Sequence, residues 1–243
     1  MDLVNKKEFL QKNGYCEFSL SEFNESFVSI LEKIKYKLGD TDYIKDFKRL
    51  RFDYHNPSKR IQISDGFETY ELCNDKKIEC IQKYDEEGIA QIWLLRDAFF
   101  GNENYRKELE NVFYEILKYF YGKSTQDVNM AIQWTLYNEG CFLKDHNDGQ
   151  GDEYQNTCAI LIYLNEEWDE NWGGNLVLRN TKDSNDKNKK TIYKVIPKFG
   201  TVAIIDLEEF DTAHAVEKVI GEHNRFTILA FATSKEKRKR QIL

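Results

Sequence analysis

Two histidines and one aspartate in this chain have the types and spacing of metal ligands. His146 and Asp148 are separated by one residue, and in extended backbone residues i and i+2 point to the same face. The imidazole and the carboxylate could therefore share a metal ion. His214, in the segment DTAHAVEKV, is the best candidate for a third ligand. Two histidines and a carboxylate that leave coordination positions open form the facial triad suited to non-haem iron(II) and oxygen chemistry.

A cation follows the third candidate ligand at the start of an apolar run. Arg225 opens the segment RFTILAF, and its guanidinium is always charged and can bind a carboxylate through two hydrogen bonds. It could hold an acidic co-substrate beside the metal, with Lys194 and Lys198 as the next candidates for that task. Thr227 would point to the same face as Arg225 and could add a hydroxyl donor. His223 lies in the turn GEHN and is expected to be exposed.

Composition narrows the class of protein that carries these residues. The chain has 243 residues, of which 41% are hydrophobic, enough for a substantial core in one large domain or two small ones. Its net charge of −7 argues against nucleic acid as the main partner. No apolar run reaches the roughly eighteen residues of a membrane span, and the N-terminus lacks the apolar core of a signal peptide. The five cysteines include no CxxC pair, which argues against a zinc site or a disulfide framework, so we expect a cytoplasmic protein.

Helical periodicity dominates the start of the chain. The pattern predicts a short helix over 5–12 that ends near Gly14, a strand at 15–18, and a second helix behind a capping box of Ser19 and Glu22. The apolar residues of this second helix recur at helical spacing: Phe23, Phe27, Ile30, Leu31, Ile34 and Leu38.

Further elements are predicted before residue 125. Two strands, 77–85 and 89–95, flank a turn, and a helix covers 104–121. His55 adjoins the turn at Asn56-Pro57 and is interpreted as structural or exposed rather than as a substrate contact.

From about residue 129 the pattern changes to one strand after another. The polar stretch 181–190 is predicted to be a hairpin tip or a loop. The predicted strands are 129–137, 157–165, 174–180, 191–197, 201–207, 214–219 and 225–233.

This order of elements predicts an α+β protein with a β-sandwich or jelly roll, because helices come first and strands follow without intervening helices. We predict a single domain, 1–243. In it, 1–125 form a helical and mixed supporting segment, 126–234 the catalytic core, and 235–243 a basic, solvated tail.

An ordered series of residues over about 100 positions, from Gln133 to Ser234, resembles the iron(II)/2-oxoglutarate dioxygenases of the prolyl 4-hydroxylase type. The matching features are, in order, Tyr137, Gly140, the HxD pair, the segment IYLNEEWDENWGGNLVL, the segment PKFGTVAIID, His214 and Arg225. HxD by itself is a weak signal, but the whole ordered series is specific. The resemblance implies a double-stranded β-helix and does not extend to the first 125 residues.

The resemblance also implies an activity and a site. Oxidative decarboxylation of 2-oxoglutarate to succinate would be coupled to hydroxylation of an aliphatic carbon, with iron(II) as cofactor, molecular oxygen consumed and ascorbate supportive. His146, Asp148 and His214 would bind the metal, and Arg225 would bind the distal carboxylate of 2-oxoglutarate. Tyr137 and Tyr163 match tyrosines of the co-substrate pocket, although plain core aromatics would look the same; Trp168 and Trp172 are interpreted as structural.

The substrate is the least determined part of the prediction. A prolyl residue in a peptide or protein is the leading candidate, and a free amino acid or another small metabolite is the alternative. Loops at the barrel mouth, including 149–156 as a potential lid and 181–190, are expected to select it. Halogenation is disfavoured because the related halogenases usually have a small residue at the position of Asp148. A non-catalytic metal-dependent binding or sensing module on the same fold remains a further alternative.

Overall fold

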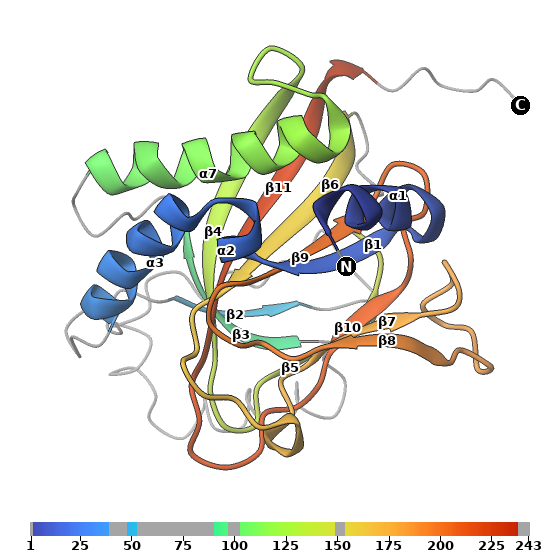
Figure 1. Cartoon of the computed structure of the whole chain (residues 1–243). Helices are drawn as coiled ribbons and strands as arrows, with labels where there is room; N and C mark the ends of the chain where they lie inside the picture. Colours follow the sequence, from blue (N-terminus) through green and yellow to red (C-terminus); the bar gives the residue numbers. More distant parts are fainter. Residues whose placement is uncertain (1, 39–47, 53–89, 97–102, 149–153, 238–243) are drawn as a thin grey trace, which may run out of the picture.

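The computed structural model describes the chain except residues 1, 39–47, 53–89, 97–102, 149–153 and 238–243. Helices cover one side of a large antiparallel sheet (Figure 1). The helices are α1 (Leu3–Asn13), α2 (Leu20–Phe23), α3 (Glu25–Leu38), α7 (Glu103–Tyr121) and the 3-10 turn η1 (Glu170–Trp172). The strands are β1 (Tyr15–Ser19), β2 (Lys48–Phe52), β3 (Ala90–Arg96), β4 (Val128–Tyr137), β5 (Phe142–His146), β6 (Tyr154–Tyr163), β7 (Leu176–Arg179), β8 (Thr191–Val195), β9 (Thr201–Asp206), β10 (His214–Val216) and β11 (Arg225–Lys237).

The sheet folds back on itself to form two layers. Its strand order is β1-β9-β6-β11-β4-β3-β5-β10-β7-β8, with β2 paired to β3. Strands β1, β9, β6, β11 and β4 make the layer under the helices, and β5, β10, β7 and β8 make the second layer (Figure 1). This is the arrangement of a double-stranded β-helix, and the predicted α+β jelly roll is confirmed. Strands β1, β2 and β3 of the first half pair within the same sheet, which the sequence did not indicate.

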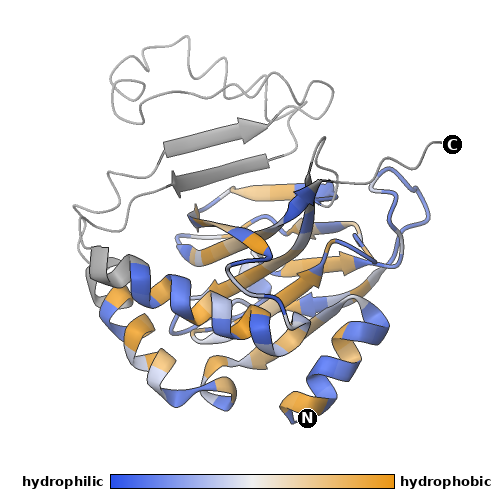
Figure 2. Cartoon of the chain, turned by 90° about the horizontal axis from the view of Figure 1, so that it is seen from above, coloured by the Kyte–Doolittle hydropathy of each residue, from blue (hydrophilic) through white to orange (hydrophobic). Residues whose placement is uncertain are grey.

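Strand β6 of the first layer is apolar on both faces because each face is buried. On β6 the side chains of Ile160 and Ile162 pack under the helices, whereas Leu161 and Tyr163 face the space between the layers, where Leu178 of β7 meets them. Successive residues of a strand point to opposite faces, so a strand buried on both sides has a continuous apolar sequence. Figure 2 shows the result, with apolar strands inside and helices that are apolar on one face.

The helices pack where their apolar stripes predict. On α7 six side chains at helical spacing are buried: Leu109, Val112, Phe113, Ile116, Leu117 and Phe120. Helix α1 ends at Gly14, whose φ of 80° suits a left-handed C-cap and whose amide donates to Leu10 O at 2.8 Å. A Cβ at this position would also lie 2.3 Å from the Phe210 side chain, so only glycine fits.

The second predicted helix is divided, because Asn24 takes an extended conformation between α2 and α3. Its side chain accepts hydrogen bonds from the amide and hydroxyl of Ser26, which caps the start of α3. The capping box of Ser19 and Glu22 therefore opens only the short helix α2.

Other differences from the predicted elements concern the strand ends. Residues 142–146 form β5, which was not among the predicted strands. Strand β10 ends at Val216, and β11 runs on to Lys237, so the start of the expected tail pairs as sheet. The predicted strand 77–85 and His55 lie outside the described residues. Among the described residues, no helix is long and apolar enough to cross a membrane.

Candidate metal and co-substrate site

Strand pairing brings the two histidines of the predicted triad face to face. His146 is the last residue of β5 and His214 the first of β10, and the two residues are partners in the antiparallel ladder. The register shifts between this pair and Val216↔Leu143, because β5 has one more residue than β10 in that interval. A β-bulge changes the direction in which nearby side chains point. This one lies next to the His146–His214 pair, and both imidazoles point to the same side.

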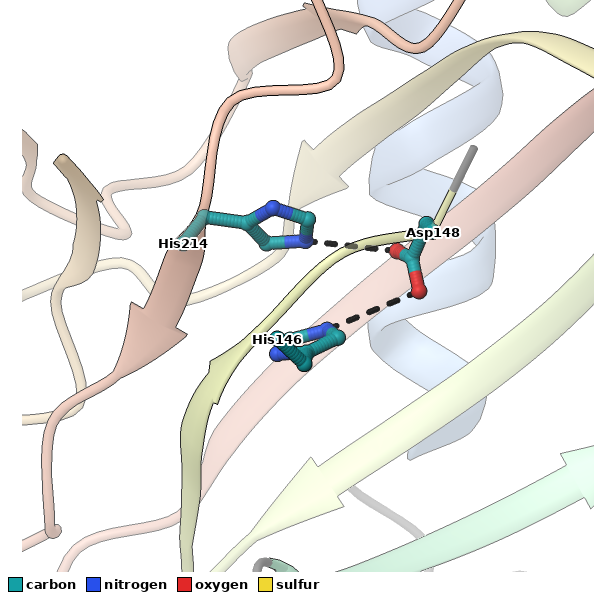
Figure 3. Close-up of side chains that lie close together, drawn as sticks. All are labelled: His146, Asp148 and His214. Carbon is teal, nitrogen blue, oxygen red and sulfur yellow. Dashed lines mark hydrogen bonds and ion pairs between the residues drawn. The ribbon is translucent and has the colours of Figure 1, made fainter. Parts of the chain in front are cut away.

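Asp148 lies two residues beyond the end of β5 and completes the cluster. Its carboxylate is 3.6 Å from Nε2 of His146 and 3.2 Å from Nε2 of His214 (Figure 3). One potential ligand atom from each residue lies within 4.8 Å of the others. Side chains from two segments distant in sequence therefore converge as a donor set of two imidazoles and one carboxylate, which suits iron(II) with open coordination positions.

Backbone carbonyls orient both imidazoles. Nδ1 of His146 is 2.8 Å from Lys144 O, and Nδ1 of His214 is 3.0 Å from Thr212 O. A neutral imidazole that donates its Nδ1–H to a carbonyl keeps Nε2 as the free ligand atom. Both Nε2 atoms point to the Asp148 carboxylate, so each ring presents Nε2 as its potential ligand atom.

The electrostatics of the cluster keep the aspartate ionised. Burial by itself would raise the pKa of Asp148, but the two imidazoles and the hydrogen bond from His214 outweigh it and hold the pKa at about 2. Burial and the neighbouring His214 lower the pKa of His146. Burial opposes charge on His214 as well, yet the bond to Asp148 leaves its pKa raised.

Arg225 lies between two tyrosines on the inner face of the first layer. It begins β11, where it is the ladder partner of Tyr137 on β4, and Thr227 is the partner of Tyr163 on β6. The guanidinium carbon is 4.8 Å from the ring centroid of Tyr137 and 5.0 Å from that of Tyr163, within the range of cation–π contacts. Both tyrosines therefore contact the arginine, which the sequence left open.

The arginine is a buried charge with unused donors. Arg225 is 1% exposed, and its Nε and Nη2 atoms have no hydrogen-bond partner within the described part of the chain. The buried hydroxyls of Tyr163 and Thr227 also lack partners, and no carboxylate among the described residues forms an ion pair with Arg225. An unpaired buried charge is costly, so this set of donors fits a carboxylate ligand supplied from outside the chain.

Gly174 leaves room for the arginine stem. Its φ is 65°, and a Cβ there would lie 3.1 Å from Cδ of Arg225 and 3.0 Å from the Trp168 ring. Trp168 in turn donates from Nε1 to Gly173 O at 2.8 Å, which confirms its structural role in this turn. The glycine pair in GGNL therefore allows the turn to close against the arginine.

Tyr137 connects the two ends of the site. Burial raises the pKa of its hydroxyl, the charge of Arg225 lowers it, and the charge of Asp148 raises it again. For Tyr163, burial raises the pKa to about 12 against the opposing effect of Arg225. The charges of Arg225 and of Asp148 therefore both act on the Tyr137 hydroxyl.

The histidine cluster, the arginine and the surrounding fold agree with a known family. Residues 132–232 match the model of the 2OG-Fe(II) oxygenase superfamily, a span from β4 to β11 that contains every candidate site residue. The match covers less than half of the chain, and within it the chain is similar to that superfamily. The prediction of a 2-oxoglutarate-dependent dioxygenase is thereby confirmed, and the family implies iron(II) and 2-oxoglutarate. No curated protein matches the oxygenase in sequence.

Solved structures share the fold of this oxygenase at low sequence identity. A prolyl-4-hydroxylase from Pseudomonas putida has a TM-score of 0.62 at 13% identity, covering 96% of this chain and 99% of that one. A prolyl hydroxylase in complex with a hypoxia inducible factor oxygen degradation domain peptide fragment, from Trichoplax adhaerens, has a TM-score of 0.63 at 14% identity, covering 96% and 90%. The non-heme alpha ketoglutarate dependent epimerase SnoN from nogalamycin biosynthesis has a TM-score of 0.61 at 10% identity, covering 99% and 86%.

Other candidate residues of the oxygenase have different roles. Lys194, an alternative cation for the co-substrate, pairs with Glu217 at 3.0 Å and Glu170 at 3.3 Å. His223 is partly buried and stacks on Trp172 with 3.7 Å between ring centroids, so the prediction that it is exposed was wrong. Most of the potential lid, 149–153, lies outside the described residues.

Sequence reasoning missed two asparagines beside the metal ligands of the oxygenase. Asn147 separates His146 and Asp148, and its side-chain amide donates to Asp211 O at 2.5 Å. Asn156 donates to Asp148 O at 2.7 Å. No sequence signal distinguishes these residues from ordinary loop asparagines, because their acceptors are backbone atoms that only the fold brings near.

Proposed function

We propose that this oxygenase hydroxylates an aliphatic carbon, with a prolyl residue in a peptide or protein as its leading substrate. The observation that carries the proposal is a three-residue cluster that could hold a metal, together with a buried arginine whose Nε and Nη2 atoms have no hydrogen-bond partner among the described residues. These two features meet the two needs of the reaction, a metal with open positions and an anchor for an acidic co-substrate.

The residues of the site have distinct tasks in this proposal. His146, Asp148 and His214 hold iron(II) through two Nε2 atoms and one carboxylate oxygen. Arg225 binds the distal carboxylate of 2-oxoglutarate, because its guanidinium provides parallel N–H donors in a buried, low-dielectric setting.

Three neutral groups complete the co-substrate pocket. The hydroxyls of Tyr163 and Thr227 have no other partner and donate to the same carboxylate. The Tyr137 ring covers the guanidinium and limits the access of water. When bound, iron(II) supplies the oxygen chemistry, in which one oxygen atom enters succinate and the other the substrate carbon.

The prolyl substrate is the part of the proposal with the least direct support. Prolyl hydroxylases share the fold over nearly the whole chain, and one of them was solved with a peptide fragment. The second candidate, a small-molecule substrate, is favoured by the comparable structural similarity to an epimerase of nogalamycin biosynthesis. Asp148 at the carboxylate position supports oxygen transfer over halogenation.

A substrate screen tests the proposal. Succinate release would be measured with iron(II), 2-oxoglutarate and ascorbate in the presence of free amino acids, proline-containing peptides or a cell lysate. Stimulation by a peptide, with a mass gain of one oxygen atom on a prolyl residue, is the expected result. Stimulation by a free amino acid alone would replace the prolyl substrate while retaining the oxygenase.

The same assay addresses the non-catalytic alternative. A binding or sensing module would take up iron(II) and 2-oxoglutarate but release no succinate with any substrate. The expected result is a slow release without substrate that Asp148→Ala abolishes. Tight binding of both ligands with no succinate under any condition would favour the module.

A further inference from the structure

One side chain links the two segments that carry the metal ligands. Asn147 lies between His146 and Asp148 on the segment after β5, and its Nδ2 atom is 2.5 Å from Asp211 O. Asp211 is three residues before His214, on the segment between β9 and β10. The two segments are separated by more than sixty residues of sequence. The hydrogen bond from the Asn147 amide joins the segment of His146 and Asp148 to the segment of His214.

The acceptor of this bond is held in an uncommon conformation. Asp211 has a φ of 40°, the one positive value among the non-glycine residues that the structure describes. A left-handed conformation is unfavourable for a residue with a Cβ and persists where surrounding contacts enforce it. The Asp211 amide donates to Asp206 O at 3.0 Å, and its carbonyl accepts from Asn147. The turn that leads to His214 is thus fixed from both sides.

A second asparagine holds the aspartate ligand from the other direction. Asn156 on β6 donates from Nδ2 to Asp148 O at 2.7 Å, while its Oδ1 accepts from the Thr233 hydroxyl at 2.8 Å. Thr233 belongs to β11, so the backbone at Asp148 is tied to two strands of the first layer. With this end anchored, the bond from Asn147 to Asp211 O adds a link between the HxD segment and the turn before His214, beyond the pairing of His146 with His214.

We propose that Asn147 is a positioning residue that sets the separation of the HxD turn and His214, and so the affinity and geometry of the metal site. It does not contact the metal; it acts through the Asp211 carbonyl. Groups that orient metal ligands typically change metal affinity by about 10- to 100-fold when they are removed. The inference rests on the proposed triad and names a determinant that the triad by itself does not include.

Cobalt(II) binding to the metal-free full chain tests this role without turnover. Asn147→Leu keeps a similar size but removes the N–H donor, and Asn147→Ala removes the side chain. The dissociation constant of cobalt(II) is expected to rise about 10-fold or more in both variants. The visible cobalt(II) spectrum should change as well, since it reports coordination geometry.

Asn165→Ala is the matched control. The Asn165 side chain also bridges segments by an amide–carbonyl bond, donating to Pro197 O at 2.7 Å and accepting from the Phe226 amide at 2.7 Å, but none of the metal ligands is among its partners. It should lower the melting temperature and leave cobalt(II) affinity and spectrum unchanged. This separates a loss of general stability from a loss of ligand placement.

The outcomes distinguish this inference from the site on which it rests. If Asp148→Ala weakens cobalt(II) binding while both Asn147 variants bind like the parent, the positioning role is wrong and the triad stands. If Asp148→Ala itself binds cobalt(II) like the parent, the triad and this inference both fall. If the Asn147 variants are less stable than the parent, the comparison uses the rise in melting temperature that cobalt(II) causes in each variant. An equal rise in the Asn147 variants and in Asn165→Ala would overturn the proposal.

Discussion

The two ends of the site are built in opposite ways. The histidine cluster lies where strands end, at a bulge of β5 and at the first residue of β10. Arg225 begins β11 and pairs with Tyr137 on β4 in a ladder without register shifts, and two residues later Thr227 has partners on both β4 and β6. Asp148 contacts both histidines of the cluster and is hydrogen-bonded to His214, whereas Nε and Nη2 of Arg225 have no partner among the described residues.

The difference reflects the different needs of the two ligands that we propose, a metal ion and a carboxylate. A metal ion needs side chains from several directions, which strand ends and turns can provide, and backbone carbonyls and asparagine amides then fix them. A carboxylate needs a charge and hydroxyls at fixed spacing, which alternate residues of neighbouring strands provide directly. The two ends should therefore respond differently to mutation and to pH.

The largest expected effect is at the metal end. Asp148→Ala removes the only carboxylate of the described cluster and leaves two imidazoles. We expect turnover to be lost and iron(II) binding to weaken strongly, measured by succinate release and by metal content after gel filtration. Affinity for 2-oxoglutarate in the absence of metal should be unaffected; unchanged activity and iron content would remove the triad assignment.

The next effect should be confined to the arginine end. Arg225→Ala removes a charge-assisted bond that contributes about 1.5–3 kcal/mol, so the 2-oxoglutarate requirement should rise roughly tenfold or more. Cobalt(II) affinity should stay at the parent value, because no metal ligand depends on the arginine. The measurement is a titration of 2-oxoglutarate against succinate release. If this variant needs no more 2-oxoglutarate than the parent protein, another cation anchors the co-substrate.

Acidification should weaken metal binding through His214. Burial disfavours its charged form, but the hydrogen bond to Asp148 leaves its pKa raised, so in the metal-free protein the ligand nitrogen takes up a proton more readily than that of a free imidazole. Metal binding must displace that proton, and affinity should fall by up to about tenfold per pH unit as the pH decreases below this pKa. His146 has a lowered pKa and should compete only at lower pH. Cobalt(II) titrations at several pH values, together with measured proton release, test this; affinity that is constant from roughly pH 8 to 6 would contradict it.

The smallest effect is expected from a neutral donor of the pocket. Tyr163→Phe removes one hydroxyl but keeps the ring against Arg225, and a net hydrogen bond contributes about 1 kcal/mol, or roughly fivefold in 2-oxoglutarate affinity. Tyr193→Phe is the matched control, since its hydroxyl donates to Glu17 at 3.1 Å rather than to the pocket. If Tyr163→Phe and Tyr193→Phe bind 2-oxoglutarate with equal affinity, the Tyr163 hydroxyl does not bind the co-substrate and the residue only packs against Arg225.

The sequence determined much of this protein without the fold. The HxD spacing, the later histidine and the arginine at the head of an apolar strand indicated the ligand types, because metal and carboxylate binding restrict residue identity. The apolar stripe of α7 and the strand runs of the second half were correct, because burial imposes their periodicity.

Only the tertiary structure showed the features that depend on backbone atoms or on residues distant in sequence. The bulge that places His146 opposite His214, the division at Asn24 and the extension of β11 follow from pairing and capping that no local pattern specifies. The roles of Tyr137 and Tyr163 became clear only from their place beside Arg225. Asn147 had no signature at all, because its partner is a carbonyl oxygen, which every residue has, and only the fold selects which one lies near.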